Sequence, residues 1–247
     1  MNTMPPRKLK GVVLLAAQTA RSQTYIQVMA AFGLLPESVI LMGEAGVAAS
    51  VEKASLNSWN DILLPHLDES VSATCKRAGV DLFLVAENDV NAEATHQAIC
   101  AAAPDIVIYS GMGGQIVSER TLALGPKFLH MHSGWLPEYR GSTTLYYSLL
   151  EGGLPGVSAI VLDREIDTGP VVARRQYPRP PAGMDLDRVY DAAIRADLMV
   201  RVLLNYKKSG SLPVIEHQNP CQGTPYYVIH PILKHLSILS LEENRHT

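Results

Sequence analysis

The sequence predicts an α/β fold with a mostly parallel β-sheet and helices on both faces, and three observations support this prediction. Apolar runs alternate with helical patterns, from the first run at 12–17 to the fifth at 127–132. These runs are nearly continuous in apolar residues, as in strands that are buried on both faces. Hydrophobic residues make up 47% of the chain and charged residues 18%, which is enough core material for a globular domain.

The spacing of apolar residues and of turn residues predicts the elements in order. Strands are expected at 12–17, 38–43, 81–87, 104–111 and 127–132, and a hairpin-like pair at the sheet edge at 156–163 and 169–178. Helices are expected at 22–34, 68–79, 91–103, 118–124, 142–153 and 184–210, with Asn91 as the cap of the third and Asp185 near the start of the last. The stretch 43–59 predicts no clear element, and 225–239 predicts a strand or a short helix.

Two structural units follow from this order. We expect an α/β catalytic domain at 1–180 and a C-terminal helix and tail at 181–247 that pack on it, with a weak boundary near Pro180 and Pro181. The first strand–helix junction, AAQTARSQT, lacks both the G-x-G-x-x-G and the P-loop patterns, which argues against a phosphate cradle there. Glycines in SGMGGQIV, after the fourth strand, allow either a flat ligand to approach the backbone or a tight turn.

Composition narrows the functional classes. The formal net charge is −3 and the sequence pI is about 6.2, so we expect no general attraction to nucleic acid. Three distant cysteines, Cys75, Cys100 and Cys221, predict reduced thiols rather than a disulfide framework. The basic start resembles a signal peptide, but its apolar run is short, and no stretch approaches the length of a membrane span. We therefore expect a cytoplasmic protein without a membrane or nucleic-acid partner.

Two histidines lie at the end of the fifth predicted strand. Residues i and i+2 share one face of a strand, so His130 and His132 should project together from its carboxyl end, where ligands bind in open α/β sheets. Three hypotheses are open: a metal pair, a pair that donates hydrogen bonds or carries protons, or a structural strand end. Asp167, in the turn of DREIDTGPVV, is a candidate partner, although aspartate before Thr-Gly is also a common turn residue.

The order of these motifs resembles that of the formyltetrahydrofolate-dependent formyltransferases. That family shows a strand ending in Asn-x-His, a turn of small residues, Leu-Pro, Arg-Gly and a distant Asp-x-Gly loop. The corresponding residues here are His130-Met131-His132, Ser133-Gly134, Leu136-Pro137, Arg140-Gly141 and Asp167-Thr168-Gly169. The resemblance covers 104–177 well and the first half only in the order of its elements. It implies the formyltransferase fold, with a Rossmann-like sheet and a short C-terminal extension.

The resemblance also implies a reaction. An N-formyltransferase moves a formyl group from 10-formyltetrahydrofolate, its co-substrate, to an amine. His132 and Asp167 match the family's histidine and aspartate, which implies roles in oxyanion stabilisation and proton transfer. His130 replaces the family's asparagine, and an imidazole N–H can also donate a hydrogen bond to an oxyanion. The alternative is a family member that binds folate or a metal at these three residues without ordinary formyl transfer.

Family members hold the pterin mostly with backbone groups of the glycine turn and of the loop before the aspartate. The expected co-substrate residues are Gly113, Gly114, Gln115, Ile116, Leu136, Pro137, Asp163, Glu165 and Ile166. Ile116 and Ile166 would line an apolar slot that suits a flat ring. Asp163 and Glu165 could instead be solvated charges.

The acceptor amine is inferred by elimination among the branches of the family. The glycine-rich first loop of the glycinamide ribonucleotide enzyme is absent, and the first hundred residues resemble the α/β core rather than an added domain. About forty residues follow the long helix, fewer than the C-terminal domain of the methionyl-tRNA enzyme needs. A small-molecule amine is left, such as an amino sugar or an amino-acid-derived amine. A tyrosine cluster, Tyr146, Tyr147, Tyr226 and Tyr227, could stack on it or could serve only packing, and a homodimer is a further expectation.

Overall fold

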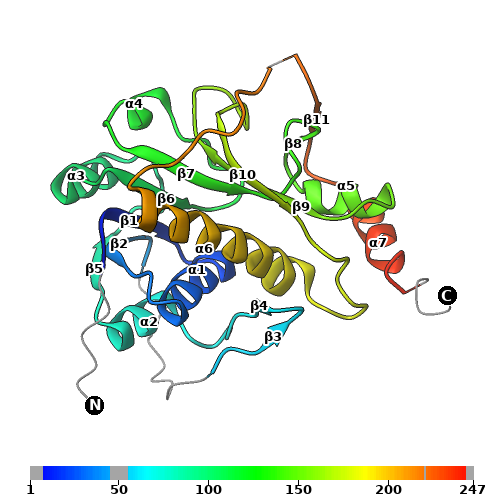
Figure 1. Cartoon of the computed structure of the whole chain (residues 1–247), viewed down its shortest axis with the longest axis horizontal. Helices are drawn as coiled ribbons and strands as arrows, with labels where there is room; N and C mark the ends of the chain where they lie inside the picture. Colours follow the sequence, from blue (N-terminus) through cyan, green and yellow to red (C-terminus); the bar gives the residue numbers. More distant parts are fainter. Residues whose placement is uncertain (1–7, 45–54, 220, 243–247) are drawn as a thin grey trace.

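Seven strands form one sheet in the computed structural model, which describes residues 8–44, 55–219 and 221–242. The strand order is β10-β9-β7-β6-β1-β2-β5 (Figure 1). Their bounds are Leu9–Ala17 (β1), Pro36–Met42 (β2), Asp81–Val85 (β5), Ile106–Ser110 (β6), Lys127–His132 (β7), Gly156–Val161 (β9) and Val171–Gln176 (β10). Strands β7, β6, β1, β2 and β5 are parallel, and β9 runs antiparallel to both β7 and β10. The mostly parallel sheet and its edge hairpin are confirmed.

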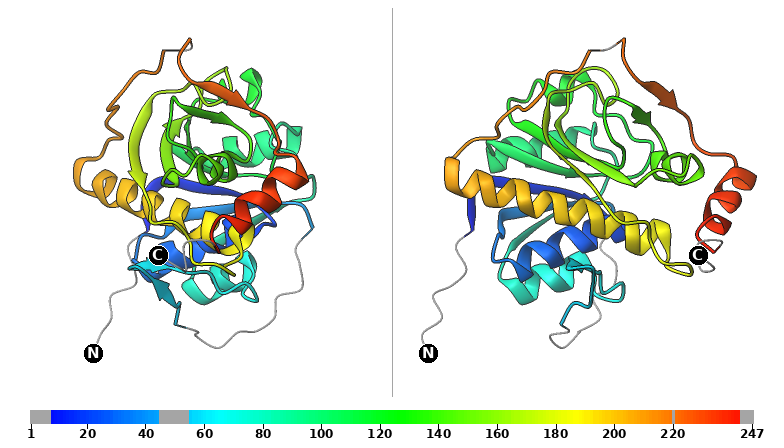
Figure 2. Two further views of the ribbon diagram at one scale, coloured as in Figure 1. Left: turned by 90° about the vertical axis from the view of Figure 1, so that its right-hand side faces the viewer. Right: turned by 45° about the vertical axis from the view of Figure 1, so that its right-hand side comes forward.

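Helices cover both faces of this sheet (Figures 1 and 2). Their bounds are Ala20–Ala31 (α1), Val71–Ala78 (α2), Glu93–Ala102 (α3), Glu119–Leu122 (α4), Thr144–Leu150 (α5), Asp191–Ser209 (α6) and Pro231–Leu239 (α7). One core cluster joins the sheet to α1, α2 and α6, and a second joins its other face to α3. The helices therefore sandwich the sheet, as the predicted fold class requires.

The central strand β1 explains why the sequence shows continuous apolar runs. Val12, Leu14 and Ala16 belong to the core cluster on the side of α1 and α6. Val13 and Leu15 belong to the cluster on the opposite side, together with Ile99 of α3 in the same layer. Because a strand buried on both faces has no polar side, an alternating pattern does not arise.

Two local predictions differ from the structure. Asn91 does not cap α3, whose N-cap is Ala92 without a side-chain hydrogen bond. The Asn91 amide instead donates to Ile116 O at 2.9 Å and accepts from Ser118 N at 2.9 Å, so it fixes the glycine-rich segment after β6.

The stretch 43–59 gave no clear element, and residues 45–54 of it lie outside the described residues. Its end forms a hairpin, Ser58–Trp59 (β3) with Ile62–Leu63 (β4), through two residues of positive φ, Asn60 and Asp61.

The C-terminal part begins as predicted and then wraps back over the sheet edge. Asp185 accepts from Arg188 N at 2.9 Å at the start of a π-helical turn, Leu186–Tyr190, which continues into α6. After α6 the chain crosses β10, where Ile215 N donates to Val171 O at 2.8 Å. Strand β11, Thr224–Tyr226, then pairs in parallel with β8, Tyr139–Gly141, and α7 packs on α5 (Figures 1 and 2). Among the described residues no helix is both long and apolar enough to cross a membrane.

Candidate active site

The end of β7 brings the predicted residues together. One ligand-type atom from each of His130, His132 and Asp167 lies within 4.8 Å of the other two. His132 is 4% exposed and Asp167 is 9% exposed, so the pair is screened from water. The two histidines leave the same face of β7, and the turn between β9 and β10 supplies the aspartate. The structure thus brings together the three side chains that the sequence singled out.

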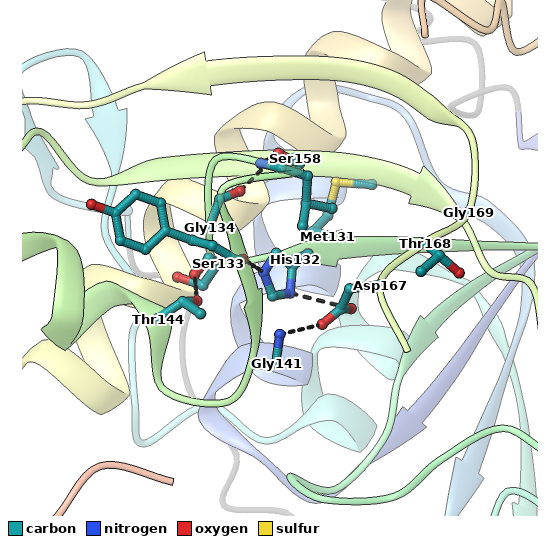
Figure 3. Close-up of polar contacts among 12 residues, drawn as sticks. Met131, His132, Ser133, Gly134, Gly141, Thr144, Ser158, Asp167, Thr168 and Gly169 are labelled. Carbon is teal, nitrogen blue, oxygen red and sulfur yellow. Dashed lines mark hydrogen bonds and ion pairs between the residues drawn. The ribbon is translucent and has the colours of Figure 1, made fainter. Parts of the chain in front are cut away.

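The ring of His132 is held at both nitrogens (Figure 3). Nε2 lies 2.6 Å from the carbonyl oxygen of Tyr139, and Nδ1 lies 3.3 Å from Oδ1 of Asp167. Both partners are oxygen acceptors, so an imidazolium satisfies both contacts and a neutral ring satisfies one. The arrangement therefore provides a place to store one proton beside a buried carboxylate.

A glycine makes this ring position available. A Cβ on Gly134 would lie 2.6 Å from Nε2 of His132 and 2.5 Å from the carbonyl oxygen of Tyr139. Any other residue would push the ring away from that carbonyl group. Ser158 Oγ braces the same turn, because it donates to Gly134 O at 2.7 Å and accepts from Leu136 N at 3.0 Å (Figure 3).

Asp167 sits in a strained turn that its neighbours hold in place. Its φ is 57°, in the left-handed region that aspartate tolerates better than most residues. Its Oδ2 accepts from Gly141 N at 2.9 Å, which leaves Oδ1 facing His132 (Figure 3). Gln218 Nε2 donates to Asp167 O at 3.0 Å and to Gly169 O at 2.7 Å, so one amide fastens both sides of the turn.

His130 has a different environment. Burial and the positive charges of Arg21 and Arg195 hold the pKa of its imidazole well below the ordinary value, so the ring is neutral at neutral pH. Its Nδ1 is buried and has no hydrogen-bond partner in the described part of the chain. Arg21, at the start of α1, donates to Ser110 Oγ at 3.3 Å and to the carbonyl oxygen of Gly111.

The residues predicted to bind the co-substrate fall into three groups. Asp163 and Glu165 line a pocket of about 510 Å³ beside the turn that holds Asp167, together with Arg164, Thr168, Pro170, His217 and Gln218. Ile116 and Ile166 are 59% and 57% exposed, and Gly113 and Gly114 are exposed beside Gln115 in the turn after β6.

Leu136 and Pro137 contribute to the turn itself. The side chain of Leu136 is fully buried against Ile160 and Val171, and its backbone groups bond to Ser158 and Arg174. Pro137 follows through a cis peptide bond. These contacts occupy both polar backbone groups of Leu136.

Comparison with known proteins identifies the family. The model of the formyl transferase family matches residues 16–201, well over half of the chain. The chain belongs to the formyl transferase family. The match includes the His130, His132 and Asp167 cluster, six of the seven strands of the sheet, and only the last two residues of β1.

Curated relatives match over part of their length. The methionyl-tRNA formyltransferase of Roseiflexus sp. (strain RS-1) is 27% identical over 174 residues, 69% of this chain and 46% of that protein. That of Finegoldia magna is 31% identical over 146 residues, 56% of this chain and 46% of that protein. This formyl transferase chain thus spans less than half the length of the curated relatives it matches.

Solved structures share the fold at low identity. Phosphoribosylglycinamide formyltransferase from Streptococcus pneumoniae TIGR4 superposes with a TM-score of 0.56 at 20% identity, over 81% of this chain and all of that one. A sugar N-formyltransferase from Shewanella sp FDAARGOS_354 superposes with a TM-score of 0.55 at 13% sequence identity, over 93% of this chain and 87% of that one. These likenesses show that this formyl transferase chain has the family fold.

Sequence reasoning missed the groups that fix the site in this formyl transferase chain. The Tyr139 carbonyl carries no side-chain signal, and Gln218 lies 51 residues beyond Asp167, outside every motif that predicted a site residue. Arg195 reaches the same strand end, donating to Met131 O at 2.7 Å while pairing with Asp191 at 2.8 Å. A weak signal for Arg195 exists, since Asp191 and Arg195 have the i,i+4 spacing of a helical ion pair.

Replacing Gln218 tests whether the tail fastens the aspartate turn. Gln218→Ala removes two hydrogen bonds, so we expect the free energy of unfolding to fall by about 1–2 kcal/mol in urea titrations. Gln222→Ala is the matched control, because Gln222 is exposed, and it should change stability by less than about 0.5 kcal/mol. Equal effects of the two substitutions would contradict the bracing role of Gln218.

Proposed function

We propose that this chain is an N-formyltransferase that moves the formyl group of 10-formyltetrahydrofolate to the amine of a small molecule. The observation that carries the proposal is the convergence of His130, His132 and Asp167 at the carboxyl end of β7, in a chain of the formyl transferase family. Their side chains offer N–H donors, a ring that can accept a proton and a carboxylate within 4.8 Å of one another. Groups of these kinds stabilise the oxyanion and carry protons in acyl transfer.

The reaction joins the amine nitrogen to the formyl carbon. Attack converts the formyl oxygen into an oxyanion, and the bond from the formyl carbon to N10 of the folate then breaks. The proton that the amine loses ends on N10, so the products are the formylated amine and tetrahydrofolate. The protein must stabilise the oxyanion and move one proton from the amine to the leaving nitrogen.

His130 is the oxyanion donor in this scheme. Its neutral ring carries one N–H, and the ring can present that hydrogen where the family's asparagine presents an amide N–H. A low pKa favours this role, because the donor stays neutral and hydrogen-bonding through the neutral pH range. One such donor contributes roughly 3–4 kcal/mol in other acyl-transfer enzymes.

His132 and Asp167 move the proton. The ring nitrogen Nδ1 faces Asp167 at 3.3 Å, and Nε2 faces the Tyr139 carbonyl at 2.6 Å, so a proton accepted by the ring is held by oxygen on both sides. The imidazolium charge also lies within the cluster that would surround the formyl group. Asp167 keeps the ring oriented through the contact that Gly141 N and Gln218 support.

The co-substrate is proposed to bind beside this cluster. The pocket lined by Asp163, Glu165 and Thr168 has a volume of about 510 Å³, within the range of small-molecule sites. The exposed glycine turn at 113–116 and exposed Ile166 supply further backbone and apolar surface. Asn91 fixes the glycine turn from the side of α3, which preorganises that surface.

A small amine is the proposed acceptor. A net charge of −3 supports a small molecule over tRNA, since tRNA binding usually needs a basic surface. A solved neighbour with 93% coverage of this chain is named a sugar N-formyltransferase. Near the site, the ring of Tyr226 contacts the ring of Tyr139, with centroids 5.4 Å apart, and the ring of Tyr147, with centroids 4.5 Å apart. Of the other two tyrosines in the predicted cluster, Tyr227 is 81% exposed and Tyr146 is buried. The exposed tyrosine edge would suit the face of a sugar or a base.

Replacing His132 or Asp167, which are proposed to carry the proton, should greatly slow turnover. We expect His132→Ala and Asp167→Asn each to lower kcat by about 10²–10⁴-fold, measured as release of tetrahydrofolate with a panel of amines. The panel includes amino sugars, nucleotide-linked amino sugars, amino acids and charged methionyl-tRNA. Full activity in both variants would contradict the assignment, and turnover only with methionyl-tRNA would contradict the small-molecule acceptor.

Replacing His130 tests its role as donor. His130→Ala removes the N–H, so formyl transfer should fall by about 10²–10³-fold in kcat. His130→Asn restores an N–H donor and should recover most of that loss. If the alanine variant matches the wild type, or if the asparagine variant stays as slow as alanine, the donor role of His130 is wrong.

A further inference from the structure

Three side chains of the catalytic cluster also form a ligand set for a metal ion. His130, His132 and Asp167 each offer one nitrogen or oxygen atom, all within 4.8 Å of one another. Two imidazoles and one carboxylate are the ligands that divalent first-row transition metals accept in proteins. We infer that this cluster binds a divalent transition metal such as Zn²⁺ through these three residues, and that the bound metal blocks the site.

Two of the ligands already have the spacing of a metal site. Tetrahedral coordination with bonds of about 2.1 Å places neighbouring ligand atoms about 3.4 Å apart. Nδ1 of His132 and Oδ1 of Asp167 are 3.3 Å apart. Among the residues that the structure describes, neither of these two atoms has another hydrogen-bond partner, so a metal between them displaces only their mutual contact.

The other ring nitrogen of His132 and the other carboxylate oxygen of Asp167 are each hydrogen-bonded to the protein, as is usual for groups that bind a metal. Nε2 of His132 donates to the Tyr139 carbonyl oxygen at 2.6 Å, which directs the lone pair of Nδ1 toward Asp167. Oδ2 of Asp167 accepts from Gly141 N at 2.9 Å, which leaves Oδ1 for the ion. Such second contacts fix ligand orientation and raise affinity.

His130 completes the set and distinguishes this chain from the family pattern. Its Nδ1 is buried without a hydrogen-bond partner among the described residues, while the ring also interacts with the backbone of Tyr109. The ligand atoms lie within 4.8 Å of one another, so none needs to approach another by more than about 1.4 Å to reach tetrahedral spacing. The family's asparagine in this place offers a far weaker metal ligand than imidazole does.

Neighbouring charges set the strength of the site. Arg21 and Arg195 lie close enough to act on His130, and their charges oppose a cation there. Asp191 pairs with Arg195 at 2.8 Å and offsets one of them. Three protein ligands leave the fourth position open to water or to an incoming ligand, unlike a closed structural zinc site. The site is therefore a reversible one, weaker than a four-ligand structural site.

Metal binding has a consequence for catalysis that rests on the proposed function. An ion on Nδ1 of His132 and Oδ1 of Asp167 occupies the proton store and the space of the formyl group. Zn²⁺ should therefore inhibit formyl transfer, and removal of the metal with a chelator should restore it.

Metal binding itself is measured without folate, so its outcome is independent of formyl transfer. The chelator-treated 247-residue chain is titrated with Zn²⁺ against a chromophoric chelator, and Co²⁺ is added separately to record the visible spectrum of the bound ion. We expect one equivalent of Zn²⁺ per chain, with at least about tenfold weaker binding in His130→Asn and in Asp167→Asn. His235→Asn is the control, because His235 is an exposed histidine on α7.

The results separate the two proposals. Equal Zn²⁺ affinity in the wild type, His130→Asn and Asp167→Asn, or no saturable binding in the wild type, would overturn the metal site and leave formyl transfer standing. Binding with the expected variant pattern in a protein that never releases tetrahydrofolate would support the metal site and overturn the proposed function. Thermal unfolding of each variant shows that it is folded, and a misfolded His130→Asn is replaced by His130→Gln in the same titration.

Discussion

The imidazole of His132 is held between two oxygen atoms, the Asp167 carboxylate and the Tyr139 carbonyl, and the rest of the site depends on that constraint. The histidine comes from β7, the carboxylate from the turn after β9, and the carbonyl from β8. Gly134 leaves room for the ring, and Gly169 for the turn, because a Cβ there would overlap the Val161 carbonyl. Glycine is therefore required at both positions, because a side chain there would overlap neighbouring atoms.

The C-terminal segment after α6 is the second element on which the site relies. Gln218 fastens the Asp167 turn, and Arg140 donates to Asn219 O at 2.9 Å on the side of β8. Strand β11 then pairs with β8, where a side chain on Gly141 would overlap the Tyr226 carbonyl. One segment therefore braces both oxygen partners of His132, which explains how loops far apart in the sequence keep a fixed distance.

Much of the fold and the central residues could be predicted from the sequence, for physical reasons. The apolar runs and the period-2 rule placed His130 and His132 on one face of β7, and the turn residues placed Asp167 between two edge strands. Gln218 and the Tyr139 carbonyl could not be found in this way, because neither backbone carbonyls nor tail contacts leave a local pattern. Asn91 was misassigned as a cap, since its side chain bonds across to the segment at 116–118 rather than to its own helix.

The most direct test of the account is a crystal structure of this chain with a non-transferable analogue of 10-formyltetrahydrofolate. The account predicts the pterin in the pocket beside Asp163 and Thr168, with the formyl oxygen within hydrogen-bond distance of a His130 ring nitrogen. The formyl carbon should lie next to His132 and Asp167. An analogue bound elsewhere, or with its formyl group directed away from these three side chains, would contradict the account.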